Sequence, residues 1–168
     1  VVPGRCSVAL TAAPLLGAWI AQRMRRALLL GPDEEALQWV RAAAAGHGLD
    51  HAVCHKQRHG DRAVDVALPD VAVRGREVVL LDDVASTGRT LVEATRGVLL
   101  EGAASVDVAV THALLVGDAW AQLREAGVRE LWSTDCVPHP TNAVSVVPLL
   151  AEAVCALVAR RDASARER

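Results

Sequence analysis

Two hydrophobic patterns alternate along this chain. Short runs of consecutive apolar residues, such as Val78-Val79-Leu80-Leu81, are typical of strands buried on both faces of a sheet. Longer stretches in which apolar residues recur every three or four positions are typical of amphipathic helices. Glycine and proline separate the segments and predict their ends. Strands are therefore expected at 27–30, 51–55, 77–82, 106–111, 129–134 and 144–147, and helices at 14–25, 33–45, 88–100, 118–126 and 149–160.

Strands that alternate with helices predict βαβ units. We therefore expect an α/β fold with a mainly parallel sheet and helices on both of its faces. The 168 residues, 52% of them hydrophobic, suit a single domain over 1–168 with a substantial core. Two segments depart from the pattern. The polar stretch 58–76 contains Pro69 and Gly75, which predicts a long mobile loop, and the charged tail 161–168 is expected to fray.

The amino-terminal segment admits two interpretations. The apolar stretch 8–20 is compatible with a secretory signal, although Arg5 is the one basic residue before it. The alternative is an amphipathic helix. Its inward residues would be Leu15, Leu16, Trp19 and Ile20, and its outward residues Gln22 and Arg23. Because the chain starts at Val1, we expect either a non-standard start or a piece of a longer protein.

Charge and composition argue against several classes of partner. The formal net charge of −2 gives no electrostatic basis for binding nucleic acid or an anionic membrane surface. No apolar run reaches the roughly 18 residues that cross a bilayer, so no membrane partner is expected. The four cysteines form no C-x-x-C pair, which favours reduced thiols and a cytoplasmic location. They are Cys6, Cys54, Cys136 and Cys155.

The strongest chemical signal lies at the end of the strand expected at 77–82. Asp82 and Asp83 stand there together, although desolvation and mutual repulsion make two carboxylates costly at a buried strand end. Hydroxyl groups of a sugar, or a magnesium ion, would offset that cost. The next residues open a helix, and their small side chains let backbone N–H groups surround a phosphate. These residues are Ser86, Thr87, Gly88, Arg89 and Thr90.

Carboxylates for hydroxyl groups, followed by a turn for phosphate, predict that the ligand is a sugar phosphate. A Walker A loop is excluded because no G-K-[ST] follows a glycine loop. The alternative is an ordinary helix cap beside solvated acids.

The segment 78–90 resembles the phosphoribosyl-diphosphate motif of type I phosphoribosyltransferases and of ribose-phosphate pyrophosphokinases. Three further stretches resemble the pyrophosphokinases in particular. They are Gly31-Pro32-Asp33, similar to their pyrophosphate-loop region; His55-Lys56-Gln57-Arg58, similar to their Lys-x-Arg catalytic loop; and 133–141 with 144–153, similar to their carboxy-terminal strand and helix. The resemblance covers about 11–158 and is closer to the archaeal-type branch, because Ser86 stands where many bacterial members have Asp.

This resemblance implies a type I phosphoribosyltransferase-like fold and a reaction that moves the β,γ-pyrophosphoryl group of ATP to the C1 hydroxyl of ribose 5-phosphate, with Mg²⁺ as cofactor. Asp82 and Asp83 would hold the ribose hydroxyls, and the residues 86–90 the 5-phosphate. Lys56, the only lysine of the chain, would stabilise charge on the transferring group together with Arg58. Asp33 would help to place Mg²⁺.

The chain departs from the family pattern in places. Glu34-Glu35-Ala36 follows Asp33 where the family loop is rich in glycine, and Arg89 stands where glycine is usual. We also expect the family's amino-terminal half, which supplies much of the ATP site, to be absent from this chain.

Two other functions stay open. A phosphoribosyltransferase would consume phosphoribosyl pyrophosphate with a nucleobase, although no aromatic residue stands out for stacking on a base. A non-catalytic binding or regulatory subunit would assemble with full-length members of the family. In either case we expect a homo-oligomer or an association with such a member.

Single residues have alternatives as well. Lys56 can be a surface lysine, Asp33 a helix N-cap alone, and Asp135 a residue at the rim of the same site. Four histidines recur every four residues, as metal ligands on one helix face would, but glycines interrupt them. They are His47, His51, His55 and His59.

Overall fold

A six-stranded sheet forms the centre of the molecule in the computed structural model, which describes residues 7–59, 63–67 and 71–166. Every neighbouring pair of strands is parallel, and the strand order is β2-β1-β5-β6-β7-β8. The expected mainly parallel α/β fold is therefore confirmed. The strands are β1 (Leu28–Gly31), β2 (Asp50–Val53), β5 (Glu77–Ala85), β6 (Ser105–Ala113), β7 (Val128–Thr134) and β8 (Asn142–Val144).

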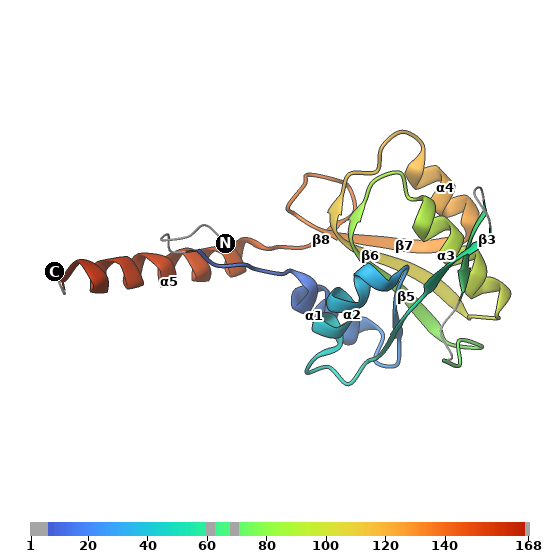
Figure 1. Ribbon diagram of the computed structural model, residues 1–168, viewed down its shortest axis with the longest axis horizontal. Coiled ribbons are helices and arrows are strands. Elements are labelled where there is room, and N and C mark those ends of the chain that lie inside the picture. Colours follow the sequence, from blue (N-terminus) through green and yellow to red (C-terminus); the bar gives the residue numbers. More distant parts are fainter. Residues whose placement is uncertain (1–6, 60–62, 68–70, 167–168) are drawn as a thin grey trace.

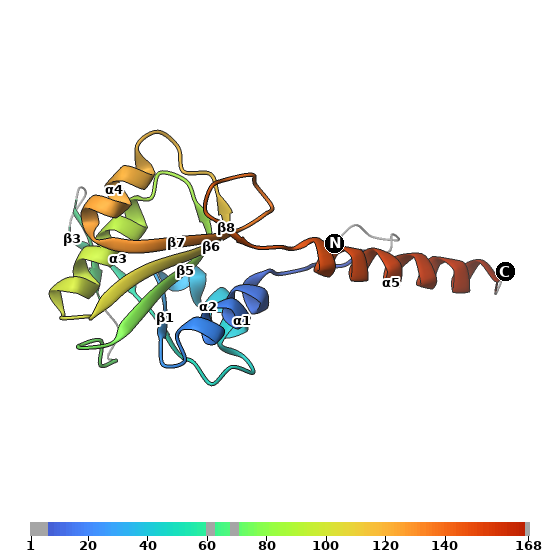
Figure 2. The same ribbon diagram turned by 180° about the vertical axis from the view of Figure 1, so that it is seen from behind.

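Helices cover both faces of the sheet (Figure 1). Helices α1 (Ala13–Arg23) and α2 (Leu37–Ala44), the latter preceded by the short 3-10 helix η1 (Glu34–Ala36), lie on one face. Helices α3 (Arg89–Leu100) and α4 (Ala119–Ala126) lie on the other, and Figure 2 shows the same layers from behind. The first four predicted helices are thus present within a few residues of their expected ends.

The strands divide their side chains between two hydrophobic clusters, as the alternation of a pleated strand requires. Leu30 and Leu80 pack with Leu91 of α3, whereas Leu29 and Leu81 pack under α1 and α2. All five side chains are buried. This double burial explains why the strand sequences are apolar without alternation.

Helix α1 settles the first alternative left open by the sequence. Its residues Leu16 and Ile20 are fully buried against α2 and the sheet, while Gln22 and Arg23 are exposed. At Gly17 an added Cβ would stand 1.9 Å from the carbonyl oxygen of Ala43, so the two helices can approach this closely because residue 17 has no side chain. The segment therefore forms an amphipathic core helix.

The prediction of a long mobile loop at 58–76 was wrong. Strands β3 (His55–His59) and β4 (Ala63–Ala67) form an antiparallel hairpin that is separate from the main sheet. Val73 then packs into the core beneath α3. The polar side chains hid the hairpin, because β3 contains no apolar residue and Asp65 interrupts the apolar residues of β4.

The carboxy-terminal region also differs from the prediction. The last strand is Asn142–Val144 rather than 144–147. Helix α5 (Val147–Arg166) starts two residues before the expected position and continues to Arg166, so the expectation that the tail frays from 161 was wrong as far as 166. Figures 1 and 2 show α5 extending away from the sheet. Apolar side chains on α5 are therefore exposed. They are Val147, Leu150, Val154 and Val158. Among the described residues, no helix is long and apolar enough to cross a membrane.

Candidate active site

The two carboxylates singled out from the sequence lie near the carboxyl end of β5, the edge where parallel α/β sheets bind ligands. The strand does not end at Asp82 as predicted, because it continues through Asp83 to Ala85 alongside β6. Both carboxylates are therefore fixed within the sheet rather than on a loose loop. The backbone N–H of Asp83 donates a 2.9 Å hydrogen bond to Oδ1 of Asp82.

A cavity of about 180 Å³ joins Asp82 to the predicted phosphate turn. Besides Asp82, five more of the seven residues predicted to bind the sugar phosphate line this cavity. They are Ser86, Thr87, Gly88, Arg89 and Thr90. Asp83, although described, is not among the lining residues, which is consistent with the alternating directions of side chains along a strand. The structure thus brings together six of the seven predicted residues.

The turn has a backbone that favours glycine at one position. Gly88 precedes the first residue of α3 with a φ of 73°, in the left-handed region that other residues adopt only at a cost. Its carbonyl oxygen accepts from the N–H of Val92, so the turn runs directly into the helix. The positive end of the α3 dipole consequently faces the cavity, as an anion site requires.

The connection between β6 and α4 holds this turn in place, a role that the sequence analysis missed. The N–H groups of Leu114 and Leu115 donate to the carbonyl oxygen of Ala85 at 3.0 and 2.9 Å, and the N–H of Val116 donates to that of Ser86 at 3.1 Å. Leu115 has a φ of 38°, which is unusual for a residue with a side chain. Such strain is found where the surrounding structure fixes the backbone at a functional site. The one sequence signal was Gly117, which marks a turn just beyond.

The electrostatics of the cavity centre on Asp82. Burial raises its pKa to about 7, and the nearby carboxylates of Asp83 and Asp33 add to this increase, although the hydrogen bond from the Asp83 N–H opposes it. Three acids therefore lie close enough at this edge to influence one another, and within the described residues Asp82 has no arginine or lysine partner. A cation or a set of hydroxyl donors would stabilise the ionised group.

Asp33 sits at the carboxyl end of β1 and serves as an N-cap. Its Oδ1 accepts from the N–H of Glu35 at 3.1 Å, and its carbonyl oxygen accepts from the N–H of Ala36. Asp33 is therefore an N-cap, and its influence on Asp82 keeps it beside the cavity. Searching the described residues finds no group of three or more His, Cys, Asp or Glu side chains arranged to hold a metal.

Lys56 and Arg58 lie on one strand of the hairpin, paired across it with Val66 and Val64. The backbone is extended there, but both side chains lie outside the part of the structure that is described. The start of β3 is tied to the Asp33 region, since Nδ1 of His55 is 2.9 Å from Oε1 of Glu34. Chain connectivity therefore brings the predicted catalytic segment to the same edge of the sheet as Asp33.

Other candidate residues have structural roles. Oδ1 of Asp135 accepts from the N–H of Val146 at 2.8 Å, which fixes the segment between β8 and α5. Hydrogen bonds from Ser145 and from that N–H lower the pKa of Asp135. Burial beside Asp33 raises the pKa of the Cys54 thiol to about 12, so this cysteine is unreactive. The described histidines of the four-residue series lie on a turn, on β2 and on β3 rather than on one helix.

Comparison with known proteins assigns this arrangement to a family. Residues 12–146 match the phosphoribosyl transferase domain, a span that includes the whole cavity. The chain belongs to the phosphoribosyl transferase domain family. The resemblance stated from the motif is thereby confirmed.

Individual relatives refine the comparison. The chain is 38% identical over 149 residues to a ribose-phosphate pyrophosphokinase of Methanosarcina acetivorans, covering 88% of this chain and 53% of that protein. It superposes on phosphoribosylpyrophosphate synthetase of Mycobacterium smegmatis with a TM-score of 0.74 and 28% identity, covering 89% of this chain and 51% of the other. It also superposes on orotate phosphoribosyltransferase of Aeropyrum pernix with a TM-score of 0.55 and 26% identity, covering 73% of this chain and 67% of the other.

These figures favour the pyrophosphokinases over the other branch of the family. The chain spans about half the length of the pyrophosphokinases that it matches. The predicted similarity to the archaeal-type branch is also supported, since several of the matched pyrophosphokinases come from archaea.

Proposed function

We propose that this chain is the sugar-phosphate-binding half of a ribose-phosphate diphosphokinase, which transfers pyrophosphate from ATP to ribose 5-phosphate. The observation that carries the proposal is the 38% identity with proteins of that name across a stretch that contains the cavity at the end of β5. In this reaction the attacking oxygen comes from the sugar, so the protein mainly positions the reactants and stabilises charge.

Each part of the cavity has a task in this proposal. The N–H groups at the start of α3 and the hydroxyls of Ser86, Thr87 and Thr90 bind the 5-phosphate. Asp82 accepts hydrogen bonds from ribose hydroxyls, and Asp83 supports the same part of the sugar. Lys56 and Arg58, on the hairpin, stabilise the charge that develops on the transferring group.

Asp33 and Asp82 are the residues that would hold Mg²⁺. The raised pKa of Asp82 beside Asp33 fits a site for a cation, and a pair of carboxylates suffices because Mg²⁺ usually completes its ligand set with water and substrate phosphates. When bound, the ion would neutralise negative charge on the phosphate groups. Ionised Asp82 is needed for this, so both sugar and metal binding should strengthen as the pH rises through about 7.

Calorimetry with ribose 5-phosphate tests the binding site. Asp82→Asn should weaken binding about tenfold, the loss expected for hydrogen bonds to a charged group. Glu101→Gln, at an exposed acid at the end of α3, is the matched control and should bind as the wild type does. Equal affinity in Asp82→Asn and the control would reject the assignment of the sugar site.

Turnover tests the reaction itself. The chain is assayed for AMP and phosphoribosyl pyrophosphate, alone and with the amino-terminal half of a relative supplied separately. Lys56→Ala should lower turnover about 10²–10³-fold because the contact forms mainly in the transition state. Lys56→Arg should recover part of it, since a planar fork replaces a point charge imperfectly.

The outcomes of this assay separate the rival functions. Full turnover in Lys56→Ala would reject the catalytic role of this lysine. Binding of ribose 5-phosphate without turnover in any combination would favour a regulatory subunit. Product formation that requires a nucleobase and phosphoribosyl pyrophosphate would favour a phosphoribosyltransferase.

We also propose that the protein acts in the cytoplasm and associates with a second copy or with a full-length family member. The exposed apolar residues of α5 support association, because their spacing of three or four residues places them on one face of the helix, and an apolar face of this kind is normally covered. Light scattering across a wide concentration range should show a species larger than the monomer. A stable monomer throughout would argue for an independent domain.

A further inference from the structure

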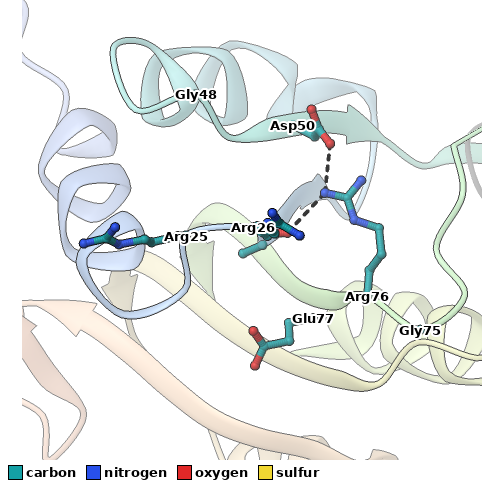
Figure 3. A pocket seen from close by; sticks show the side chains of 8 residues that line it. Arg25, Arg26, Gly48, Asp50, Gly75, Arg76 and Glu77 are labelled. Carbon is teal, nitrogen blue, oxygen red and sulfur yellow. Dashed lines mark hydrogen bonds and ion pairs between the residues drawn. The ribbon is translucent and has the colours of Figure 1, made fainter.

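A second cavity lies at the opposite end of the sheet from the ribose-phosphate site. It is larger, at about 410 Å³, and is formed where β1, β2 and β5 begin. Its lining includes Arg25 and Arg26 before β1, Gly48 and Asp50 at β2, and the segment Gly75-Arg76-Glu77 at the start of β5 (Figure 3).

The charged residues of this cavity are unequally paired. Asp50 forms a 2.9 Å ion pair with Arg76, and Glu77 lies 3.6 Å from Arg129 outside the cavity. Arg76 also donates a 3.2 Å hydrogen bond to the carbonyl oxygen of Arg26. By contrast, neither Arg25 nor Arg26 has an acidic partner within the described part of the chain. Both acids of the cavity are engaged, and two guanidinium groups are not.

The orientation of the side chains separates these two arginines. Arg76 donates to the backbone carbonyl oxygen of Arg26 near the middle of the view, between Asp50 and Glu77, whereas the side chain of Arg25 reaches away from them (Figure 3). Three arginines and two acids line the cavity, so its lining carries an excess of positive charge. Arg26 and Arg76 therefore present the donors for an anionic group, and Arg25 adds positive charge at the edge.

The shape of the cavity leaves room for a ligand. Gly48 and Gly75 both have positive φ, and a Cβ added at either would meet nothing within 4 Å. The volume lies within the range of about 300–1,000 Å³ typical of small-molecule sites. This volume is larger than an inorganic phosphate would fill. The ligand therefore carries a second polar part, which donates hydrogen bonds to the carboxylates of Asp50 and Glu77.

We propose that this cavity binds an organic phosphate that bears hydroxyl groups. The guanidinium groups of Arg26 and Arg76 hold the phosphate through paired hydrogen bonds, the geometry in which arginine binds this group best. The carboxylates of Asp50 and Glu77 accept from the hydroxyls. The site is separate from the sugar-phosphate cavity, although the same strand, β5, runs from Glu77 in one to Asp82 in the other.

Nuclear magnetic resonance titration of the whole chain with glycerol 3-phosphate distinguishes the two cavities. The amide signals of Gly48 and Gly75 report on the proposed site, and that of Gly88 reports on the turn at α3. The glycerol phosphate should shift Gly48 and Gly75 with one dissociation constant. Arg26→Gln, which breaks no side-chain interaction of the described residues, should raise that constant about tenfold and leave the response of Gly88 unchanged.

Arg41→Gln is the matched control, because Arg41 is an exposed arginine on α2 outside the cavity. It should titrate as the wild type does. Signals of Gly48 and Gly75 that do not move, or that respond equally in wild type and Arg26→Gln, would overturn the site. Inorganic phosphate that binds as tightly as glycerol 3-phosphate would overturn the role of Asp50 and Glu77 in selecting hydroxyl groups.

Discussion

Two carboxylates at opposite ends of the sheet have contrasting surroundings. Near the amino end of β6, Asp107 is fully buried, and its oxygens accept from Arg129 at 3.0 and 2.6 Å and from the N–H of Glu130 at 3.1 Å. At the carboxyl end of β5, Asp82 has the N–H of Asp83 and two neighbouring acids. One carboxylate is paired by the fold, and the other has no arginine or lysine partner within the described residues.

The contrast shows how structural and functional acids can be separated in a fold of unknown activity. The hydrogen bonds to Asp107 raise the pKa of Arg129, which favours the charged guanidinium group, and they join β6 to β7. The surroundings of Asp82 favour the neutral form instead. A group that the folded protein keeps in an unfavourable state is a candidate for function.

The largest effect on stability should come from removing the ion pair between Arg129 and Asp107. Arg129→Met leaves the Asp107 carboxylate buried without a cation, and the free energy of unfolding should fall by about 3 kcal/mol. Urea denaturation measures the loss. Arg41→Met, at an exposed arginine, should change it by less than about 0.5 kcal/mol. Similar losses in both variants would mean that the ion pair contributes little.

Asp82→Asn tests the unpaired end through its pH dependence. The folded pKa of about 7 is above the unfolded value of roughly 3.9, so the wild type loses stability as the pH rises from about 4 to about 7. The variant lacks this loss and should be more stable by about 1–3 kcal/mol at pH 8, and equal to the wild type near pH 4. Urea titrations at several pH values measure the difference.

This gain should come together with the weakened binding of ribose 5-phosphate. Glu101→Gln is again the control and should show no pH-dependent difference. A difference between Asp82→Asn and wild type that is constant from pH 4 to 8 would contradict the unfavourable charge at this end.

Gly88→Ala tests the phosphate turn with a smaller effect. A side chain at a φ of 73° should cost about 1–2 kcal/mol. Gly46→Ala is the matched control, because Gly46 has a φ of 78° and open space around it, away from the cavity. Both variants should lose similar stability, but Gly88→Ala alone should bind ribose 5-phosphate more weakly. Equal binding in the two variants would exclude a special role for the turn.

The smallest effect should come from Asp135→Asn, at a paired and exposed carboxylate after β7. Hydrogen bonds from Ser145 and Val146 lower its pKa, so the ionised group stabilises the fold above its unfolded pKa, and this is lost as the pH falls through the folded pKa. The thermal midpoint of the variant should be slightly lower at neutral pH and equal in strong acid. This is the reverse of the dependence expected for Asp82, at the same edge of the sheet.

The sequence predicted what local patterns determine. The apolar strands and the residues 82–90 were located because their chemistry is contained in one short segment. The hairpin was missed because Val64 and Val66 form a strand by pairing with Arg58 and Lys56, whose polar side chains gave no sign of a strand. The last strand was misplaced because the side chain of Asn142 donates to Ser133 and Thr134 across the fold, a contact that no local pattern encodes.

The strand order has a consequence for how the chain reaches its fold. Strands β5 to β8 are neighbours in both sequence and space. Strand β1 instead pairs with β5, which follows it in the chain only after α2, β2 and the hairpin. Pairing between distant segments is slow because the intervening chain must first be closed. As the chain leaves the ribosome, Leu29 and Leu30 therefore stay without their central partner until 77–85 has emerged. The amino-terminal third is the part that we expect chaperones to shield.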